Sequence, residues 1–402
     1  MSAPGGESRR EVVYIEGDGI GQEVTPPAIL AIDAAVKGAY GGERSLVWTE
    51  ALAGQKARQK TGASLPEETL EAIRRTRVAL KGPLETPVGP GGIRSLNVAL
   101  RQELDLYACV RPVKHFEGVS TPICRPEQLD IVIFRENTED VYAGIEWREG
   151  SPEALRVIDF LNGQMGCRIP KDSGVGVKPM SERGSKRLVR RAIRYALENG
   201  RCAVTLVHKG NIMKFTEGAF RDWGYEVALR EFPEQTVTET EVKAREHGGD
   251  LAGIVPPGAI VVNDRIADAM FQELLLRPAR YDVLALSNLN GDYISDAAAA
   301  QVGGLGLAPG GNIGDEYAVF EATHGTAPDI VGKGMANPGS LILSGAMMLT
   351  HLGWKEAAER LEGAVRRTLA AGRVTPDLAE GLDRAEILKT QEFGRAVAAE
   401  AA

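Results

Sequence analysis

Short apolar runs alternate with helix-like segments along most of this 402-residue chain. The runs at 12–15, 131–134 and 283–286 are rich in Val, Ile and Leu and end at polar or glycine residues, as buried strands do. Helical patterns lie between such runs, for example at 22–37 and 185–198. This alternation predicts an α/β fold. Glycine-rich segments near both ends suggest a large domain built from both termini, with a smaller domain inserted between them.

The composition argues against several classes of partner. With 47 basic and 55 acidic residues the net charge is −8, which offers no overall basic surface to nucleic acid or to an anionic membrane. The N-terminal segment lacks an apolar core, which predicts no signal peptide, and the uncharged run at 337–354 contains Pro338 and glycines, as expected for a buried helix. Four cysteines without metal-binding spacing indicate a reducing compartment. We therefore expect a cytoplasmic protein without a membrane or nucleic-acid partner.

The stretch 288–296 joins an expected strand to an expected helix. The turn-prone pair Asn290-Gly291 predicts a break after the strand, and the alanine-rich pattern that follows predicts a helix beginning near Tyr293. On that helix Asp292 and Asp296, four residues apart, would place their carboxylates on one face.

Such paired carboxylates at a strand end suit a hard divalent cation. A second pair with the same spacing, Asp264 and Asp268, lies just upstream. The alternative needs no metal: Asp292 would then cap the helix and Asp296 would be a solvated charge.

A glycine-rich loop follows the first expected strand. Gly17, Gly19 and Gly21 have the spacing GxGxG, whereas the dinucleotide-binding fingerprint is GxGxxG. The loop therefore fits a tight turn between strand and helix better than a cofactor site.

Several polar side chains fall at the ends of expected elements, where they can converge on a small anion. Ser95 and Asn97 begin a helix after a glycine-rich loop, where they either bind a ligand or cap the helix. Three arginines suit a polycarboxylate or a phosphate ester, although each alone is commonly a surface ion pair: Arg101, Arg111 and Arg135.

Two further segments draw attention. Lys209 follows the strand at 204–207, a position that suits either an active-site lysine or a structural salt bridge. Residues 140–180 are interrupted by glycines and prolines and are interpreted as an irregular arm or clasp.

Taken together, six motifs resemble those of the metal-dependent decarboxylating β-hydroxyacid dehydrogenases, the isocitrate/isopropylmalate dehydrogenase family, and within it the bacterial isocitrate-oxidising branch. They cover nearly the whole chain, at 15–21, 92–101, 134–144, 208–214, 288–296 and 321–328. The resemblance implies this family's α/β fold, which is not a Rossmann fold. It also implies a large domain at 1–107 and 303–402, a small domain at 108–139 and 182–302, and a clasp or arm at 140–181.

The resemblance further implies the residues of an active site that is shared between the two subunits of a homodimer. Tyr142 and Lys209 match the acid–base pair, and Asp268, Asp292 and Asp296 match the ligands of Mg²⁺ or Mn²⁺, with Asp268 reaching over from the partner subunit. The substrate-binding positions are matched by Ser95, Asn97, Arg101, Arg111 and Arg135. The cofactor-binding positions are matched by Thr86, Glu321, His324, Gly325, Asp329, Ile330 and Asn337.

Ser95 and Asn97 favour isocitrate as the substrate, because two hydrogen-bonding groups suit its extra carboxylate better than the apolar side chain of isopropylmalate. Same-fold enzymes for isopropylmalate, homoisocitrate or tartrate are the nearest alternatives. A nucleotide- or anion-binding regulatory module built on the Gly17 loop is an alternative of a different class, but it leaves the aspartates and Lys209 unexplained.

The cofactor is expected to be NAD. Asp329 and Ile330 stand where relatives that use NADP have a lysine and a tyrosine, and Pro376 and Glu380 replace two further phosphate-binding side chains. A carboxylate repels a 2′-phosphate but accepts hydrogen bonds from a free 2′-hydroxyl. Arg277, which matches another arginine near the phosphate, is retained, and NADP is therefore the alternative.

Overall fold

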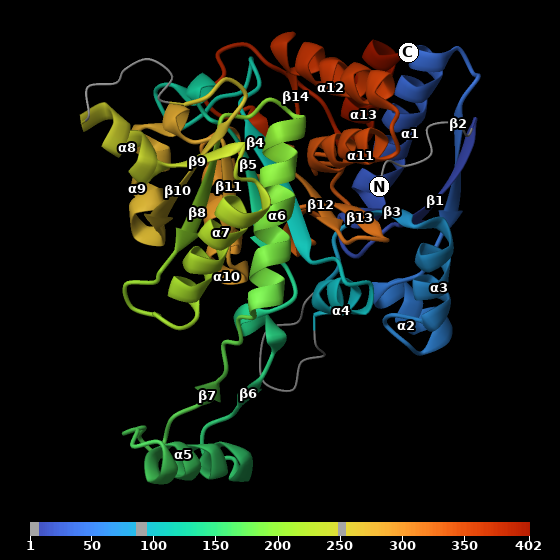
Figure 1. Ribbon diagram of the computed structural model, residues 1–402. Coiled ribbons are helices and arrows are strands. Elements are labelled where there is room, and N and C mark those ends of the chain that lie inside the picture. The colour runs from blue at the N-terminus through green and yellow to red at the C-terminus, as the bar shows by residue number, and fades with distance from the viewer. Residues whose placement is uncertain (1–7, 86–94, 248–254) are drawn as a thin grey trace.

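The computed structural model describes residues 8–85, 95–247 and 255–402 of the chain. Their main feature is one 11-stranded sheet that runs through the whole molecule (Figure 1). The strands lie in the order β2 (Ser45–Glu50), β1 (Arg9–Ile15), β3 (Val78–Lys81), β13 (Ala318–Ala322), β12 (Pro309–Ile313), β4 (Ala108–Lys114), β5 (Asp130–Glu136), β11 (Val283–Leu286), β8 (Ala203–His208), β10 (Ile260–Ile266) and β9 (Thr236–Thr238). Alternation of these strands with helices confirms the predicted α/β fold.

The sheet changes direction in its middle. β12 runs antiparallel to both of its neighbours, β13 and β4, and β4 runs antiparallel to β5, whereas all other neighbours are parallel. Strands on one side of the β12–β4 pair come from the two ends of the chain, and strands on the other side come from residues 108–286. The glycine-rich β12 was not expected from the sequence. The exact domain boundaries stay a prediction.

Helices cover both faces of the sheet, and the strand residues alternate between them. Beside β11, Val283 and Ala285 pack with α6 (Glu182–Glu198) and α7 (Glu217–Glu231). Leu284 and Leu286 pack with α9 (Ala267–Leu276) and α10 (Asn288–Ala300) on the opposite face. The continuous apolar run at 283–286 is therefore that of a strand buried on both sides.

The other half of the sheet is covered in the same way. One face carries α1 (Gly21–Tyr40), α11 (Gly339–His351), α12 (Lys355–Ala370) and α13 (Thr390–Ala401), and the other carries α2 (Gly54–Thr61), α3 (Glu67–Thr76) and α4 (Leu96–Glu103). The buried α11 confirms the core helix expected near 337–354.

The remaining elements are short or lie at the edge of the sheet. The C-terminal region contains the two-residue strands β14 (Arg373–Val374) and β15 (Glu386–Ile387), and α8 (Glu239–His247) follows β9. No helix of the described ranges is long and apolar enough to cross a membrane.

The glycine loop after β1 is a tight turn. A Cβ atom at Gly17 would lie 2.3 Å from the carbonyl oxygen of Pro83, and one at Gly19 would lie 2.3 Å from that of Thr326. Backbone N–H groups of this loop already donate to those carbonyls, from Asp18 and Ile20 respectively. Glycine is therefore required for close packing of the chain, and these N–H groups are not free to bind a phosphate.

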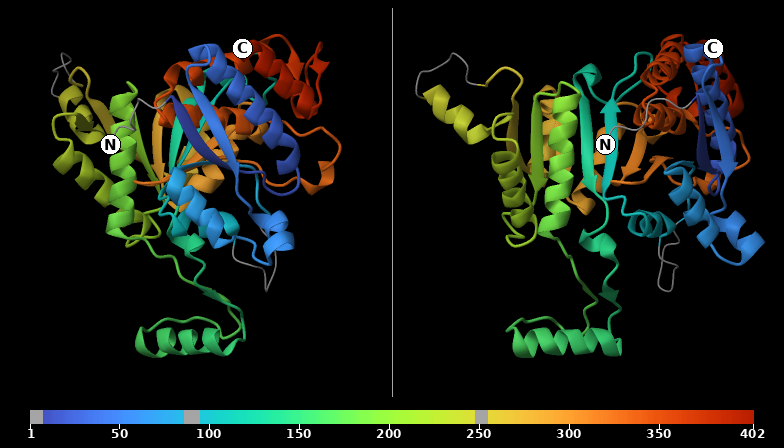
Figure 2. Two further views of the ribbon diagram at one scale, coloured as in Figure 1. Left: turned by 90° about the vertical axis from the view of Figure 1, so that its right-hand side faces the viewer. Right: turned by 45° about the vertical axis from the view of Figure 1, so that its right-hand side comes forward.

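Residues 144–181 project from the body of the molecule, as Figures 1 and 2 show. The arm contains the short antiparallel pair β6 (Glu146–Trp147) and β7 (Val175–Gly176), with α5 (Pro152–Gln164) at its far end. The expectation of an irregular arm is wrong for α5. Ser151 caps this helix by accepting a hydrogen bond from the Ala154 N–H, and Pro152 occupies the first turn, so the start signal was present in the sequence.

The expected break at Asn290-Gly291 is also wrong. Helix α10 begins at Asn288, so the pair lies within its first turn. The reason is packing: a Cβ atom at Gly291 would lie 2.5 Å from Cγ of Arg135, so glycine lets the helix lie directly on β5. Asp292 is consequently inside the helix and does not cap it.

Candidate active site

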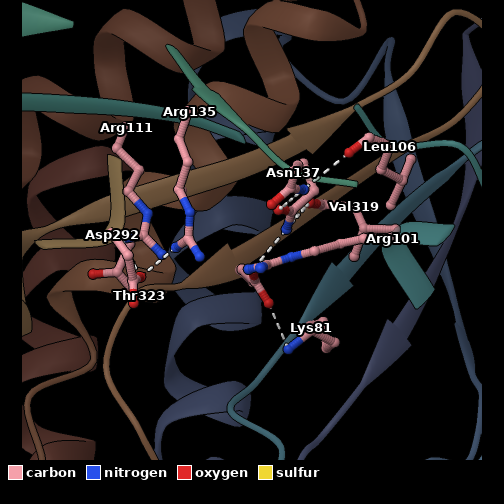
Figure 3. Close-up of polar contacts among 12 residues, drawn as sticks. Lys81, Arg101, Leu106, Arg111, Arg135, Asn137, Asp292, Val319 and Thr323 are labelled. Carbon is pink, nitrogen blue, oxygen red and sulfur yellow. Dashed lines mark hydrogen bonds and ion pairs between the residues drawn. The ribbon is translucent and has the colours of Figure 1, made fainter. Parts of the chain in front are cut away.

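Three arginines gather near the end of β5, the first half of β4 that pairs with it, and the last turn of α4. Arg111 and Arg135 extend side by side from the two antiparallel strands, and Arg101 approaches from α4 (Figure 3). All three side chains are buried. Burial and the nearby charges of Arg111 and Arg101 lower the pKa of Arg135.

Asp292 and Asp296 of α10 face these arginines. A nitrogen of Arg111 lies 3.7 Å from Asp292 Oδ1 and 3.3 Å from Asp296 Oδ1. One guanidinium thus reaches both carboxylates, as expected for residues four apart on one helix face. Arg135 also donates to Asp292, and its Nε donates to Asn288 Oδ1 at 2.9 Å.

The two aspartates differ in acidity. Burial opposes ionisation of Asp292, but Arg135 and the Tyr142 hydroxyl outweigh it and hold the pKa of Asp292 below its usual range. Burial prevails at Asp296, where it raises the pKa despite Arg111. Tyr142, in the 3-10 turn η2 (Asp140–Ala143), donates to Asp292 Oδ2 at 2.6 Å. Burial together with this contact raises the pKa of Tyr142 to about 12. The phenol therefore keeps its proton at neutral pH.

Glu321 lies between two buried cations. Its carboxylate is 2.7 Å from Lys81 Nζ and 3.1 Å from a nitrogen of Arg101, and Asn312 donates to it at 2.6 Å. Burial opposes ionisation, but Lys81 and Arg101 hold the pKa of Glu321 far below its usual range. The residue expected to bind the cofactor thus anchors Arg101 in this structure.

The cluster retains unsatisfied polar atoms. The Nε atoms of Arg101 and Arg111 and the Oδ1 atom of Asn97 are buried without a hydrogen-bond partner among the described residues. Buried donors of this kind are costly unless a ligand satisfies them. Ser95 immediately precedes α4, and its side chain does not cap that helix. The two arginine Nε groups can therefore donate to an anionic ligand, whereas the Asn97 oxygen is an acceptor and needs a donor.

Lys209 and Asp268 lie apart from this cluster and pair with each other. Lys209 follows β8, Asp268 lies in the first turn of α9, and Lys209 Nζ is 2.5 Å from Asp268 Oδ1. The hydrogen bond from Lys209 lowers the pKa of Asp268. Within one subunit the salt-bridge alternative for Lys209 is thus what the structure shows.

A divalent cation fits part of the predicted ligand set. Asp292 and Asp296 supply the hard oxygen donors that Mg²⁺ and Mn²⁺ prefer. In the part of one chain that the structure describes, however, no group of three or more His, Cys, Asp or Glu side chains gathers for a metal. Asp292 and Asp296 thus offer two carboxylates, and the assignment of Asp268 from a second subunit as a further ligand stays a prediction.

The expected cofactor-binding residues lie mostly on the loop after β13. His324 Nδ1 contacts the carbonyl of Gly325 at 3.0 Å, while its Nε2 is buried without a partner within the described ranges. Burial lowers the pKa of His324, so the neutral ring presents Nε2 as an acceptor. This orphaned atom fits a nucleotide N–H or O–H group.

The remaining cofactor candidates have different environments. Asp329 and Ile330 form the 3-10 turn η5 (Pro328–Ile330), and Asp329 is exposed. Asn337 is buried; it donates to Asp377 at 3.1 Å and accepts from the Gly339 N–H at 2.8 Å, which is a structural arrangement. Thr86 lies outside the described residues.

Four participants were missed in the sequence: Lys81, Asn288, Ser295 and Asn312. Asn288 orients Arg135, and Ser295 Oγ accepts a hydrogen bond from Arg111 at 2.5 Å. Lys81 could have been found in the sequence, because a lysine that ends an apolar run of a buried strand needs a buried partner of opposite charge. Asn312 could not have been found in this way, since the strand that contains it, β12, was not predicted.

The fold and the site are those of an α/β protein with a buried arginine cluster beside two aspartates. The chain belongs to the isocitrate/isopropylmalate dehydrogenase family, whose model matches residues 11–397. This confirms the family resemblance noted in the sequence.

Individual relatives narrow the comparison. Over 396 residues the chain is 55% identical to a Pseudomonas aeruginosa protein named isocitrate dehydrogenase [NADP], covering 96% of this chain and 92% of the relative. It is 56% identical over 386 residues to a protein of the same name from Archaeoglobus fulgidus, covering 96% and 91%. The crystal structure of isocitrate dehydrogenase from Methylococcus capsulatus has a TM-score of 0.80 and 39% identity, and covers 98% of this chain and 99% of that one.

These names contradict the expectation of NAD. The expectation rested on residue types at four positions and on the repulsion of a 2′-phosphate by a nearby carboxylate. Asp329 and Glu380 are exposed, where water and salt weaken charge interactions to about 1 kcal/mol or less. Repulsion of that size is too weak to exclude NADP, which is the cofactor named for relatives that share more than 50% identity with this chain.

Proposed function

We propose that the protein catalyses the oxidative decarboxylation of isocitrate to 2-oxoglutarate and CO2, with NADP as the hydride acceptor and a divalent metal as an activator. The observation that carries this proposal is the convergence of Arg101, Arg111 and Arg135, with buried Nε donors that lack partners, beside two carboxylates on α10. A tricarboxylate satisfies those donors. NADP is taken from the names of the relatives.

The reaction has two stages. The 2-hydroxyl loses its proton and C2 passes a hydride to the nicotinamide, giving a ketone. The bond from C3 to the adjacent carboxylate then breaks and releases CO2, and C3 takes up a proton.

The arginines bind and orient the substrate carboxylates, and Ser95 and Asn97 add hydrogen-bonding atoms at the start of α4. Asp292 and Asp296, with Asp268 of a second copy, would hold Mg²⁺ or Mn²⁺. Such a cation supplies Lewis-acid stabilisation of negative charge on the 2-oxygen. Tyr142 is protonated and half-buried beside Asp292, which suits a group that donates the final proton.

A homodimer is part of the proposal, because Lys209 and Asp268 pair with each other within one subunit and not with the arginine cluster. Large apolar side chains near them are exposed in the monomer, on α9 and in the loop after β8: Ile212, Phe215, Leu275 and Leu276. An exposed patch of this kind is typical of a protein interface. A second copy would cover it and bring Lys209 and Asp268 to the partner's Tyr142 and α10. The four free cysteines agree with a cytoplasmic location.

A substrate panel tests the proposal. Isocitrate, isopropylmalate, homoisocitrate and tartrate are compared by kcat/KM with NADP and Mn²⁺. The proposal predicts a preference for isocitrate of at least about 100-fold, because the buried donors of the site penalise an analogue that lacks a carboxylate. A preference for isopropylmalate would assign the protein to the other branch of the family.

A further inference from the structure

Glu217 is a fully buried carboxylate that the proposed reaction does not use. It is the first residue of α7, and it lies next to the segments that carry the proposed catalytic groups. Burying a carboxylate is costly unless it is fully hydrogen-bonded, so its partners indicate what it holds in place.

Each oxygen of Glu217 accepts from two donors. Oε2 accepts from the backbone N–H of Lys209 at 2.9 Å and from the side-chain amide of Asn290 at 2.8 Å. Oε1 accepts from the Ser287 hydroxyl at 2.8 Å and from Lys178 Nζ at 2.8 Å. One carboxylate thus joins the loop after β8, the start of α10 and the base of the arm.

Lys178 extends this connection to the proposed proton donor. Its Nζ also lies 2.5 Å from Asp140, the first residue of the turn that carries Tyr142. Asp140 in turn accepts from the backbone N–H of Leu289, in the first turn of α10, at 3.0 Å. The two carboxylates of this cluster are buried and Lys178 is half-buried, and the cluster contacts the backbone next to both proposed proton-transfer groups.

Asp140 supports a positioning role through its backbone. It is a non-glycine residue with φ of +67°, a left-handed conformation that other residues than glycine rarely adopt. Such local strain persists when surrounding contacts impose it, and it is typical of functional sites.

We infer that Glu217 is a positioning residue that fixes the loop of Lys209 against the metal-binding helix α10, with Lys178 and Asp140 extending the same clamp to Tyr142. This inference rests on the proposed function, in which α10 holds the metal and Tyr142 donates a proton, and on the family resemblance that places Lys209 in the acid–base pair. Buried ionic groups add little net stability compared with apolar packing, and their best-supported use is to set one arrangement among several. Here the arrangement is the relative placement of three segments that are distant in the sequence.

The variant Glu217→Gln tests the clamp at nearly constant volume. A glutamine presents an NH2 group where the carboxylate had an oxygen, so at least two of the four donors lose their acceptor. We expect kcat to fall by at least about tenfold, because misplacement of a catalytic group by about 1 Å can cost about 100-fold. The KM for isocitrate should stay within about threefold, since the four donors to Glu217 do not include an arginine of the cluster.

The matched control is Asp282→Asn. Asp282 lies before β11 and beside the start of β8, whereas Glu217 contacts the segments that follow the ends of these two strands. Asp282 accepts from the Cys202 N–H before β8 at 2.6 Å and pairs with Arg201 at 2.8 Å. It is also a carboxylate that joins a backbone N–H to a cation, but it lies at the start of β11, whereas Lys209 follows the end of β8. We expect its kcat to stay within about twofold of the wild type.

Hydrogen–deuterium exchange adds a readout that is independent of activity. Residues 209–216 and 287–292 should exchange faster in Glu217→Gln than in the wild type, and at the wild-type rate in Asp282→Asn. If Glu217→Gln does not fold, Asn290→Ala removes a single donor from the clamp and should lower kcat about threefold with the same regional change in exchange.

The possible outcomes are distinguishable. Unchanged kcat and unchanged exchange in Glu217→Gln, or equal effects in Asp282→Asn, would overturn the inference. A wild-type enzyme that does not turn over isocitrate would refute the proposed function, and the exchange data alone would then decide whether Glu217 holds these segments together.

Discussion

The buried pairing of Glu321 with Lys81 and Arg101 leads to a quantitative prediction for Glu321→Gln. The change leaves Lys81, of which 2% of the side chain is exposed, with no carboxylate partner among the contacts that the structure shows. Removing one partner of a buried ion pair costs about 3–5 kcal/mol. That loss is a large part of the about 5–15 kcal/mol that holds a typical protein folded.

Glu362→Gln provides the comparison. Glu362 also contacts two cations, Lys114 and Arg366, but about one third of its side chain is exposed. Pairs of this kind contribute about 0–1 kcal/mol. Urea unfolding of the wild type and both variants, followed by circular dichroism and tryptophan fluorescence, measures the two losses. Losses of equal size, or a loss below about 1 kcal/mol for Glu321→Gln, would refute the argument from burial.

The pH dependence of the same difference follows from the lowered pKa of Glu321. A carboxyl group whose pKa is lower in the folded protein stabilises the fold above its unfolded pKa of about 4.3. The stabilisation is lost as the pH falls towards the folded pKa. The difference between wild type and Glu321→Gln should therefore be constant near pH 7 and shrink below about pH 4. A difference that grows on acidification would contradict the assigned sign.

Three further results are expected. Tyr142→Phe should lower kcat by about 10²–10⁴-fold, the range for loss of a general acid, with a change in unfolding free energy of no more than about 1–3 kcal/mol for one hydrogen bond to a carboxylate; a kcat within about threefold of the wild type would exclude Tyr142 as the donor. Because the pKa of Asp296 is raised, protons should compete with Mn²⁺ as the pH falls, and Asp296→Asn should raise the Mn²⁺ concentration for half-maximal activity about tenfold or more while weakening this pH dependence; an unchanged Mn²⁺ requirement would remove Asp296 from the metal site. Leu276→Asp, which places a charge in the exposed apolar patch of α9, should shift the mass measured by light scattering from dimer to monomer, and a monomeric wild type would contradict the shared active site.

Much of the fold could be predicted because buried parallel strands are marked by continuous apolar runs. The run at 283–286 became β11 at the expected residues, since every one of its side chains is buried on one face or the other. β12 carried no such signal: it contains Pro309 and two glycines and is held by pairing with its neighbours. Local patterns do not report pairing between distant segments.

The errors at α10 have the same origin. Asn290-Gly291 is a turn signal in isolation, but the missing Cβ of Gly291 allows the helix to lie on Arg135. Tertiary packing overrides local propensity in such cases. The site was predictable as a set of residue types, whereas the roles of Glu321 and Lys209 within one subunit depend on contacts with Lys81 and Asp268 that only the folded chain brings together.

The central claim is tested most directly by one assay of the purified protein with isocitrate, in which kcat/KM is measured with NADP and with NAD, each with Mn²⁺ and with EDTA. We expect formation of one NADPH per CO2 released, a kcat/KM for NADP that exceeds that for NAD, and loss of turnover in EDTA that added Mn²⁺ restores. A kcat/KM for NAD equal to or above that for NADP would contradict the proposed cofactor, and full turnover in EDTA would contradict the role given to Asp292 and Asp296.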